Sequence, residues 1–234
     1  MSEDQKSNLF KKIKIIEDHN DYLIVNKPGG LLSQGGRDEE EGHLLSYLQK
    51  LQKQKLHLLT RIDRPVSGLV MLSKLRGFNK HYQSIQEKEK VTKTYIALVE
   101  GLVEERSGTL THYLYHHKKL RKAILENGPK ENYDKIELKY TVLAKLDRYS
   151  ILSTEILNGR FHQIRSQLAQ FGFPVKGDVK YGARRGNKDR SINLHSYKIE
   201  FADRSNQRLS FKAKFPNDDN LWNIVSEAIE KNKL

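Results

Sequence analysis

The chain contains no cysteine, and this absence excludes several classes of site at once. Without thiols there is no disulfide framework, no thiolate zinc site, no iron–sulfur cluster and no cysteine nucleophile. With 234 residues, the chain is long enough to bury a core that needs neither disulfides nor a structural metal. The lack of cysteine fits a reducing compartment, and we expect a cytoplasmic protein.

Long hydrophobic runs are missing as well. No apolar run approaches the roughly 20 residues that a membrane-spanning helix needs. Residues 1–12 are polar and lack the apolar stretch of a secretory signal. We therefore expect a soluble monomer without a membrane partner, in which residues 1–12 form a polar tail and residues 13–234 form a single domain.

Positive charge is in excess, and it is unevenly spread. Lys and Arg number 42 against 29 Asp and Glu, which gives a formal net charge of +13. Such an excess indicates a polyanionic partner, more often nucleic acid than an anionic membrane, although general basicity for solubility is the alternative. The cations concentrate in residues 112–130 and 176–190. The first segment contains Lys118, Lys119, Arg121, Lys122 and Lys130; the second contains Lys176, Lys180, Arg184, Arg185, Lys188 and Arg190.

Sequence motifs for nucleotide cofactors and metals are absent too. There is no Walker phosphate loop, no G-x-G-x-x-G after a strand, no H-E-x-x-H and no G-x-S-x-G. The acidic run at residues 38–41 lacks the spaced ligands and turn glycine of a calcium loop. His112, His116 and His117 have no nearby carboxylate or thiol partners, so we expect them in a solvated or nucleic-acid-facing loop. We expect no metal site.

Apolar periodicity predicts more strands than helices. Strands are expected at residues 22–25, 69–72 and 92–101, and residues 197–201 and 209–215 alternate as an antiparallel hairpin with one wet face. Helices are expected at residues 42–53 and around 78–85, and a terminal helix has a buried stripe of Leu221, Val225, Ala228 and Ile229. Strands seldom alternate strictly with helices, so the expected class is α+β with a large, mainly antiparallel mixed sheet flanked by helices.

One further helix is predicted between residues 158 and 172. Phe161, Ile164, Leu168 and Phe171 fall on one face, which we expect to join the core, and Gly172 is suited to end the helix. His162 and Arg165 are three residues apart and share a different face. On the pattern alone, a surface role for this pair is the default and a site role is the alternative.

The segment at residues 58–69 has an unusual density of charge. Arg61 and Arg64 flank Asp63 where a strand breaks into a loop, just before another buried strand. One interpretation is a surface loop with a local salt bridge. The other is a carboxylate that the neighbouring cations hold ionised, ready to act as nucleophile or base. Spacing alone favours the surface loop.

This segment resembles the catalytic motif H-R-L-D-x-x-T-S-G-L of the RluA family of RNA pseudouridine synthases. Other blocks resemble that family in the same order and together cover roughly residues 13–215. Residues 21–32 are similar to its N-K-P-x-G motif, and residues 93–101 to its K-x-Y-x-A-x-V-x-G strand. Residues 158–182 are similar to its G-R-T-H-Q-I-R motif with the G-D-x-x-Y-G tail, and Leu194-His195 to its late L-H-A motif. The ordered set is far more specific than any single match.

The resemblance implies roles for matching residues. Asp63 corresponds to the catalytic aspartate, Tyr95 to the tyrosine that packs against the target uracil, and Arg165 to the basic residue that pairs with the catalytic carboxylate. Arg61 corresponds to the arginine that enters the RNA stack where the target nucleotide leaves it. We further expect RNA contacts from Arg160, His162 and Gln163, and from the cations Lys118, Lys119, Arg121, Lys122, Lys180, Arg184 and Arg185.

Several residues depart from the family pattern. Thr60 stands where the motif has His, Ile62 where it has Leu, and Arg64-Pro65-Val66 replaces the usual run before Ser67. Phe161 stands where Thr is usual, and Ser196 follows His195 in place of Ala. None of these departures removes a reactive group.

The resemblance implies a catalytic domain that converts a specific uridine of rRNA or tRNA to pseudouridine. The reaction is an isomerisation, so neither a nucleotide cofactor nor a metal is expected. One alternative is a catalytically silent RNA-binding or ribosome-assembly protein on the same fold. Another is a glycoside hydrolase with Asp63 and Asp178 as paired carboxylates, which the net charge and the lack of an aromatic sugar platform disfavour.

Overall fold

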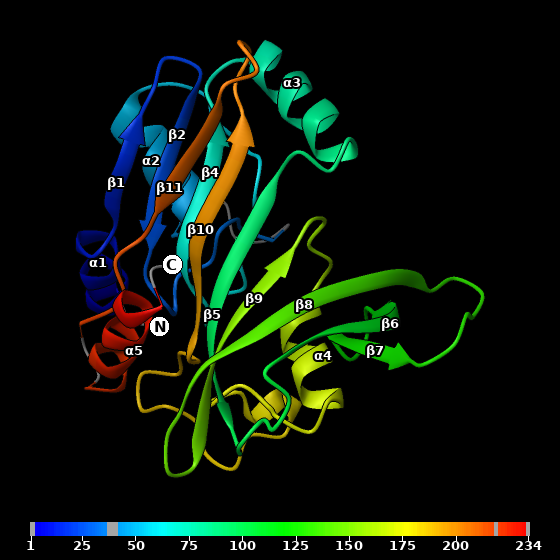
Figure 1. Cartoon of the computed structure of the whole chain (residues 1–234). Helices are drawn as coiled ribbons and strands as arrows, with labels where there is room; N and C mark the ends of the chain where they lie inside the picture. Colours follow the sequence, from blue (N-terminus) through cyan, green and yellow to red (C-terminus); the bar gives the residue numbers. More distant parts are fainter. Residues whose placement is uncertain (1–2, 37–41, 218–219, 233–234) are drawn as a thin grey trace. The chain divides into compact units, whose positions relative to one another are not determined.

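The computed structural model describes residues 3–36, 42–217 and 220–232, so the acidic run at residues 38–41 lies outside the described residues. The chain divides into two compact units (Figure 1). The first unit comprises Met1–Lys93, Asp189–Ser191 and His195–Pro216, and the second comprises Thr94–Lys188, Ile192–Leu194 and Asn217–Leu234.

The first unit is built on a mixed sheet. Its strands follow the order β1-β2-β4-β10-β11, with β3 paired to β4. All of these pairs are antiparallel except β4 with β10, which is parallel. The strands are β1 (Lys14–Asp18), β2 (Tyr22–Lys27), β3 (His57–Leu58), β4 (Ser67–Ser73), β10 (Leu194–Ala202) and β11 (Arg208–Lys212). The helices are α1 (Glu3–Lys11), α2 (Leu44–Gln52) and α3 (Arg76–Glu87).

Burial of β2 and β4 explains why their sequences are continuous apolar runs. All seven residues of β4 are buried, so both faces of this strand are covered. Phe78, Tyr82 and Ile85 of α3 pack onto the core at the spacing of one helical face. The expected strands and helix α3 are confirmed, and β10 pairs with β11 as the expected hairpin, but β11 ends at Lys212, so residues 213–215 lie outside the strand. Helix α2 also forms, with Leu44 and Leu48 buried and Leu51 52% exposed in the last turn.

The second unit is built on a sheet of longer strands. Its order is β5-β9-β8-β6-β7, and the pairs β6–β7, β6–β8 and β8–β9 are antiparallel. The strands are β5 (Thr92–Glu100), β6 (Ser107–His117), β7 (Lys122–Glu126), β8 (Asp134–Lys145) and β9 (Tyr149–Ile156). The helical segments are α4 (Gln163–Gln170), the 3₁₀ turn η1 (Val179–Tyr181) and α5 (Asn220–Lys231).

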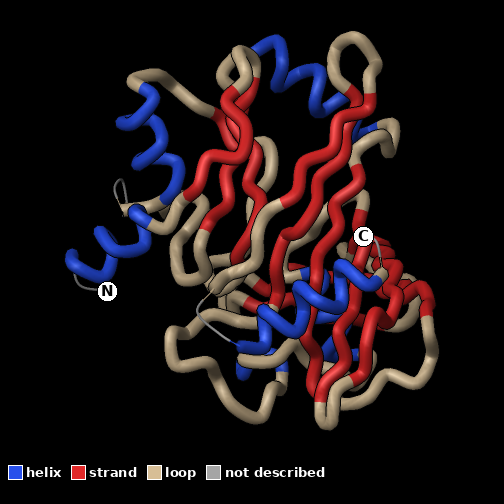
Figure 2. Tube along the Cα trace, turned by 60° about the vertical axis from the view of Figure 1, so that its left-hand side comes forward, coloured by secondary structure: helices blue, strands red, loops and turns tan. Residues whose placement is uncertain are grey.

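The terminal helix α5 confirms the expected stripe in part. Val225, Ala228 and Ile229 are buried as predicted, and Trp222 joins them in place of Leu221. The expected α+β class with a large, mainly antiparallel mixed sheet is confirmed, and Figure 2 shows the helices as short segments beside longer strands. Among the helices that the structure describes, none is long and apolar enough to cross a membrane.

Candidate active site

Asp63 lies in the first unit, on the loop between β3 and β4. Its side chain is half-buried, whereas the flanking Arg61 and Arg64 are exposed. The backbone carbonyl of Asp63 accepts the N–H of Val66 at 3.1 Å, which closes a tight turn directly before β4. A second loop, at residues 28–33, is hydrogen-bonded to this one: Gly30 N donates to the Arg64 carbonyl at 2.7 Å, and the Ser33 hydroxyl donates to the Ile62 carbonyl at 2.8 Å.

Lys27 connects these two loops through hydrogen bonds. This residue ends β2 and is fully buried. Its ammonium donates to the carbonyls of Pro28 at 2.9 Å, Leu31 at 2.7 Å and Val66 at 2.8 Å. Burial lowers the pKa of Lys27 to about 7; the Asp63 carboxylate raises this pKa, and the Arg64 guanidinium lowers it further. A buried cation therefore interacts with Asp63 and ties the loop at residues 28–33 to the strand that follows Asp63.

Three neighbouring motif residues make hydrogen bonds that hold the strands and the Asp63 loop together. The hydroxyl of Thr60, which replaces the motif His, accepts the N–H of Met71 at 2.8 Å and so anchors the Asp63 loop to β4. Ser67 Oγ and His195 Nδ1 lie 2.8 Å apart and join β4 to β10. Burial lowers the pKa of His195 to about 3, so its ring is neutral at pH 7. These contacts give the departure at Thr60 a structural explanation.

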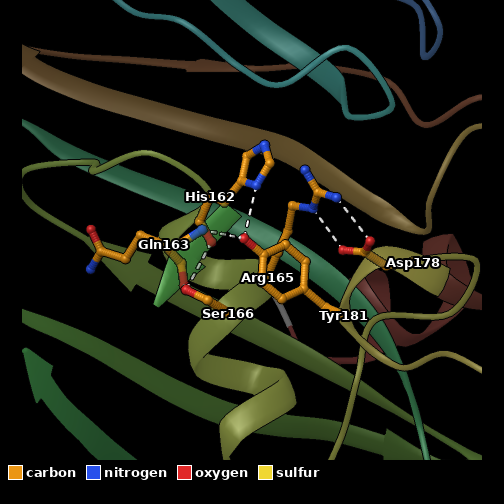
Figure 3. A network of polar contacts seen from close by, with 7 residues as sticks. His162, Gln163, Arg165, Ser166, Asp178 and Tyr181 are labelled. Atoms are coloured by element: carbon orange, nitrogen blue, oxygen red, sulfur yellow. Dashed lines mark hydrogen bonds and ion pairs between the residues drawn. The ribbon is translucent and has the colours of Figure 1, made fainter. Parts of the chain in front are cut away.

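In the second unit, a buried ion pair organises the start of α4 (Figure 3). Arg165 is 5% exposed, which corrects the expectation of a surface role. Its Nε donates to Asp178 Oδ2 at 2.6 Å and its Nη2 to Asp178 Oδ1 at 2.8 Å. The guanidinium also lies over the ring of Tyr181, 5.1 Å from the centroid. A bidentate pair of this kind fixes the orientation of the arginine as well as its charge.

The residues before α4 are equally constrained. His162 adopts a left-handed conformation (φ 53°) at the N-cap, and its Nδ1 lies 2.9 Å from the Tyr181 hydroxyl, as Figure 3 shows. The same hydroxyl accepts the N–H of Ala123 at 2.8 Å. Phe161 therefore lies outside the helix, and the expectation that it joins the apolar face of α4 is wrong. Its ring is half-buried and stacks on His116 and His162.

The other expected site residues differ in their exposure and contacts. Lys118, Lys119 and Arg121 are exposed on the turn between β6 and β7, and we name this trio the basic turn. Lys122 lies over the Tyr181 ring at 5.2 Å. Gln163 is buried, and its amide donates to the Glu137 carbonyl at 2.9 Å. The remaining cations, Lys180, Arg184, Arg185 and Arg160, are exposed.

Tyr95 and His112 are both buried in the second unit. Tyr95 lies on β5, 7% exposed. His112, His116 and His117 were expected in a loop, but all three lie on β6, where His112 accepts a hydrogen bond from the amide of Gln167 at 3.1 Å. Burial lowers the pKa of His112. Within the part of the chain that the structure describes, no three His, Asp or Glu side chains are grouped to hold a metal ion.

Sequence reasoning missed two residues that shape the site. Lys27 carried no assigned role, although the N-K-P motif that contains it was the available signal. Asp178 was considered as the second carboxylate of a glycoside hydrolase, and only the fold reveals it as the partner of Arg165, because thirteen residues separate the two in sequence.

Comparisons with known proteins find RNA pseudouridine synthases. The family model described as RNA pseudouridylate synthase matches residues 21–170. Ribosomal large subunit pseudouridine synthase D of Borreliella burgdorferi is 28% identical over 215 residues, which cover 87% of this chain and 65% of that protein. Ribosomal large subunit pseudouridine synthase C of Buchnera aphidicola is 34% identical over 216 residues, covering 86% of this chain and 66% of that protein.

The chain thus spans just under two thirds of the length of these relatives. Among solved structures, human RNA pseudouridylate synthase domain containing 1 superposes with a TM-score of 0.74 at 22% identity, covering 89% of this chain and 87% of the other. That likeness shows a shared fold. The family model covers more than half of the chain, and so the chain belongs to the RNA pseudouridylate synthase family.

Proposed function

We propose that this chain isomerises uridine to pseudouridine in structured RNA, with Asp63 as the catalytic carboxylate. The observation that carries the proposal is the setting of Asp63: a half-buried carboxylate, flanked by two arginines, on a loop that the buried Lys27 fixes. The relatives are named as synthases of the large ribosomal subunit, which favours rRNA over tRNA as the substrate.

The reaction needs an ionised carboxylate and a target nucleobase that the enzyme can reach. The N1–C1′ bond breaks, the uracil turns, C5 bonds to C1′, the C5 proton leaves, and N1 takes up a proton, so that product and substrate have the same formula. Nothing is oxidised and no phosphate moves. Asp63 acts on the target nucleotide as a nucleophile or as a base. The exposed Arg61 fills the place in the RNA stack that the target uridine leaves. Flipping a base out of folded RNA costs a few kcal/mol, and contacts of this kind offset that cost.

The second unit supplies the remaining groups of the proposal. Tyr95 packs against the target uracil, and Arg165 pairs with the catalytic carboxylate. Asp178 and Tyr181 hold Arg165 in one orientation, and we assign both as positioning residues. Gln163 positions the loop before α4, since its amide is bonded within the protein. The exposed cations of this unit contact RNA phosphates.

The glycoside hydrolase alternative loses support from the state of Asp178. That alternative needs a second carboxyl group available as a general acid or base. Asp178 is 2% exposed and both of its oxygens accept hydrogen bonds from Arg165. A carboxylate that is buried and engaged by a guanidinium in this way is out of contact with water and is not available to a substrate.

The test replaces Asp63 with Asn and measures tritium release from large-subunit rRNA transcribed with 5-tritiated uridine. Because pseudouridine formation exchanges the C5 hydrogen, release reports turnover directly. We expect release to fall at least about 100-fold, the range for loss of an acid, base or nucleophile. RNA binding survives, since the charge change leaves the basic surface intact. Asp147→Asn, a change at an exposed carboxylate, is the matched control and keeps wild-type turnover.

Two outcomes contradict the proposal. Residual release above about one hundredth of wild type from folded Asp63→Asn protein excludes a chemical role for Asp63. A wild-type chain that binds rRNA and tRNA yet releases no tritium from either is a silent RNA-binding protein. Mapping pseudouridines in RNA from cells with and without the gene identifies the modified uridine.

A further inference from the structure

Three aromatic rings form a continuous stack on one side of the second unit. Phe161 lies 3.8 Å from His116 and 3.8 Å from His162, centroid to centroid, with interplanar angles of 25° and 17°. Two rings that both stack on a third at this distance must cover its opposite faces. The order is therefore His162, Phe161, His116, and we name it the ring ladder. Its inner end contacts Tyr181, and His116 at its outer end is exposed.

A cavity opens beside the outer end of the ring ladder. Its volume is about 470 Å³, within the roughly 300–1,000 Å³ of small-ligand sites. Strand β8 begins at Asp134, opposite Leu114 of β6, and β6 continues for three residues past this pair. The cavity occupies this step at the sheet edge. Its lining residues are Leu114, Tyr115, His116, Asn132, Tyr133, Asp134, Arg160 and Phe161.

Aromatic walls and a polar rim give this cavity the chemistry of a nucleobase site. His116 and Phe161 line it, and so do Tyr115 and Tyr133, whose rings lie 5.4 Å apart. The rim presents an amide, a carboxylate and a guanidinium. Arg160 Nε lies 3.2 Å from Asp134 Oδ2, and both side chains are more than half exposed. An ion pair so exposed contributes little to stability, so its groups can turn to the donors and acceptors of a base edge.

We propose that this cavity binds one unpaired nucleotide of the RNA substrate, whose base stacks on the outer face of the ring ladder. The inference rests on the proposed function for its RNA partner and names a second contact beside the target uridine. Base stacking on aromatic side chains is the usual way to hold single-stranded nucleic acid. The basic turn begins directly after His117, the last residue of β6. Its cations are therefore close enough in the chain to His116 to contact the phosphates that flank the bound nucleotide.

The site is a feature of this chain's own sequence. Phe161, the central ring of the ladder, stands where the family motif has threonine, which has no ring to stack. The ladder also connects to the catalytic groups within the unit: His162 contacts the hydroxyl of Tyr181, and the Tyr181 ring faces the Arg165 guanidinium. A nucleotide held on His116 is thereby linked to Arg165 through a chain of direct contacts.

The experiment compares two probes of equal length: a ten-nucleotide oligoadenylate and the same ribose-phosphate chain without bases. Fluorescence anisotropy at one fixed salt concentration gives both affinities. Wild type binds the oligoadenylate at least about five-fold more tightly, since one stacked base contributes that much or more. Phe161→Thr and His116→Ala each lower oligoadenylate affinity about five-fold or more and leave the abasic affinity unchanged. Phe161→Tyr, which keeps a ring, retains the preference.

The matched control is Tyr47→Ala. It removes one ring of another stacked pair, Phe10 with Tyr47, in the first unit, and leaves both affinities at wild-type values. His116 is exposed, so its alanine variant folds even if Phe161→Thr does not. Oligoadenylate affinity within two-fold of wild type in folded Phe161→Thr and His116→Ala overturns the inference. Wild type that binds neither probe, or binds both equally, also overturns the inference. Tritium release from rRNA by wild type is measured separately and alone decides the isomerase proposal, so the two failures are distinguishable.

Discussion

Among single residues, Lys27 exerts the strongest control over the Asp63 loop. Its ammonium is fully buried, yet it satisfies carbonyls on both loops and interacts with the Asp63 carboxylate. Desolvating an ammonium is costly, and three good acceptors together with a nearby anion offset that cost. We infer that Lys27 places Asp63 and does not contact RNA.

Replacing Lys27 with Met tests this role. The substitution keeps volume but leaves the carbonyls of Pro28, Leu31 and Val66 without their donor. We expect the free energy of unfolding to fall by about 1–3 kcal/mol, the cost of buried unsatisfied polar groups. Tritium release falls at saturating RNA, whereas RNA affinity stays near wild type because no exposed cation is lost. A variant that loses affinity but keeps its saturating rate contradicts a positioning role.

The same residue predicts a pH dependence of stability. The pKa of Lys27 is about 7 in the folded protein and near 10.4 in the unfolded chain. Between these values the unfolded chain binds more protons, so the free energy of unfolding rises with pH. Lys93, with a pKa of about 8, acts in the same direction. Subtracting the free energy of unfolding of Lys27→Met from that of wild type removes the Lys93 contribution. Denaturant melts from pH 7 to 10 should show this difference rising with pH.

The buried pair of Arg165 and Asp178 yields a second prediction at this scale. Asp178→Asn leaves a buried guanidinium without its anion, and we expect a loss of about 3–5 kcal/mol in unfolding free energy. The double variant Arg165→Met with Asp178→Asn removes the unpaired charge and recovers most of that stability. Turnover stays low in both variants if Arg165 orients the catalytic carboxylate. Recovery of turnover along with stability contradicts that role.

Residue roles were predictable from sequence only where a motif marks them. Asp63 stands out because two arginines flank it and a family motif surrounds it. The partner of Arg165 did not stand out, since a contact between a helix and a distant turn leaves no periodic signal. Phe161 was assigned to the core because, in a helix, it would lie on the same face as Ile164 and Leu168. The helix begins only at Gln163, after His162 in a left-handed conformation, so helical spacing does not apply to Phe161.

At the scale of elements, the parallel pair of β4 and β10 depends on one glycine. Gly68 adopts φ +112°, and a Cβ there would lie 2.3 Å from the Ser196 carbonyl oxygen. Gly68→Ala therefore forces β10 away from β4, and we expect a loss of about 2–4 kcal/mol from overpacking and backbone strain. Gly128→Ala, with nothing within 4 Å of the added carbon, is the control and stays within about 0.5 kcal/mol of wild type by thermal or urea melts.

Elements with both faces buried were predictable, and those with one wet face mostly were not. Strands β2, β4 and β5 are apolar runs, and α3 has a clean buried stripe. Strand β8 alternates buried Ile136, Leu138 and Tyr140 with exposed polar residues, and its twelve residues include three lysines, one glutamate and one aspartate. Such a strand becomes recognisable only beside the partners that cover its apolar face. The register of β6 against β7 and β8 likewise follows from pairing between distant segments.

For the molecule as a whole, the decisive property is the net charge of +13. The question is whether RNA responds to total charge or to its placement. The basic turn presents three exposed cations on four consecutive positions of one hairpin. A control set of equal charge lies at the end of α2 and after it, and is also exposed: Lys50, Lys53 and Lys55. Reversing either set to glutamate changes the net charge by the same amount.

RNA affinity is expected to fall steeply with salt because phosphate contacts release counterions. If the cations of the second unit contact about six phosphates, the logarithm of the binding constant falls with the logarithm of salt concentration at a slope of about −4 to −5. Charge reversal of the basic turn should make this slope shallower by about 3, roughly one for each lost phosphate contact, without changing which uridine is modified. The control set should lower affinity modestly at low salt and leave the slope unchanged. Filter-binding titrations from 50 to 300 mM salt separate the cases: equal effects of the two sets, or a wild-type slope near zero, would contradict a defined phosphate-contacting surface on the β6–β7 hairpin.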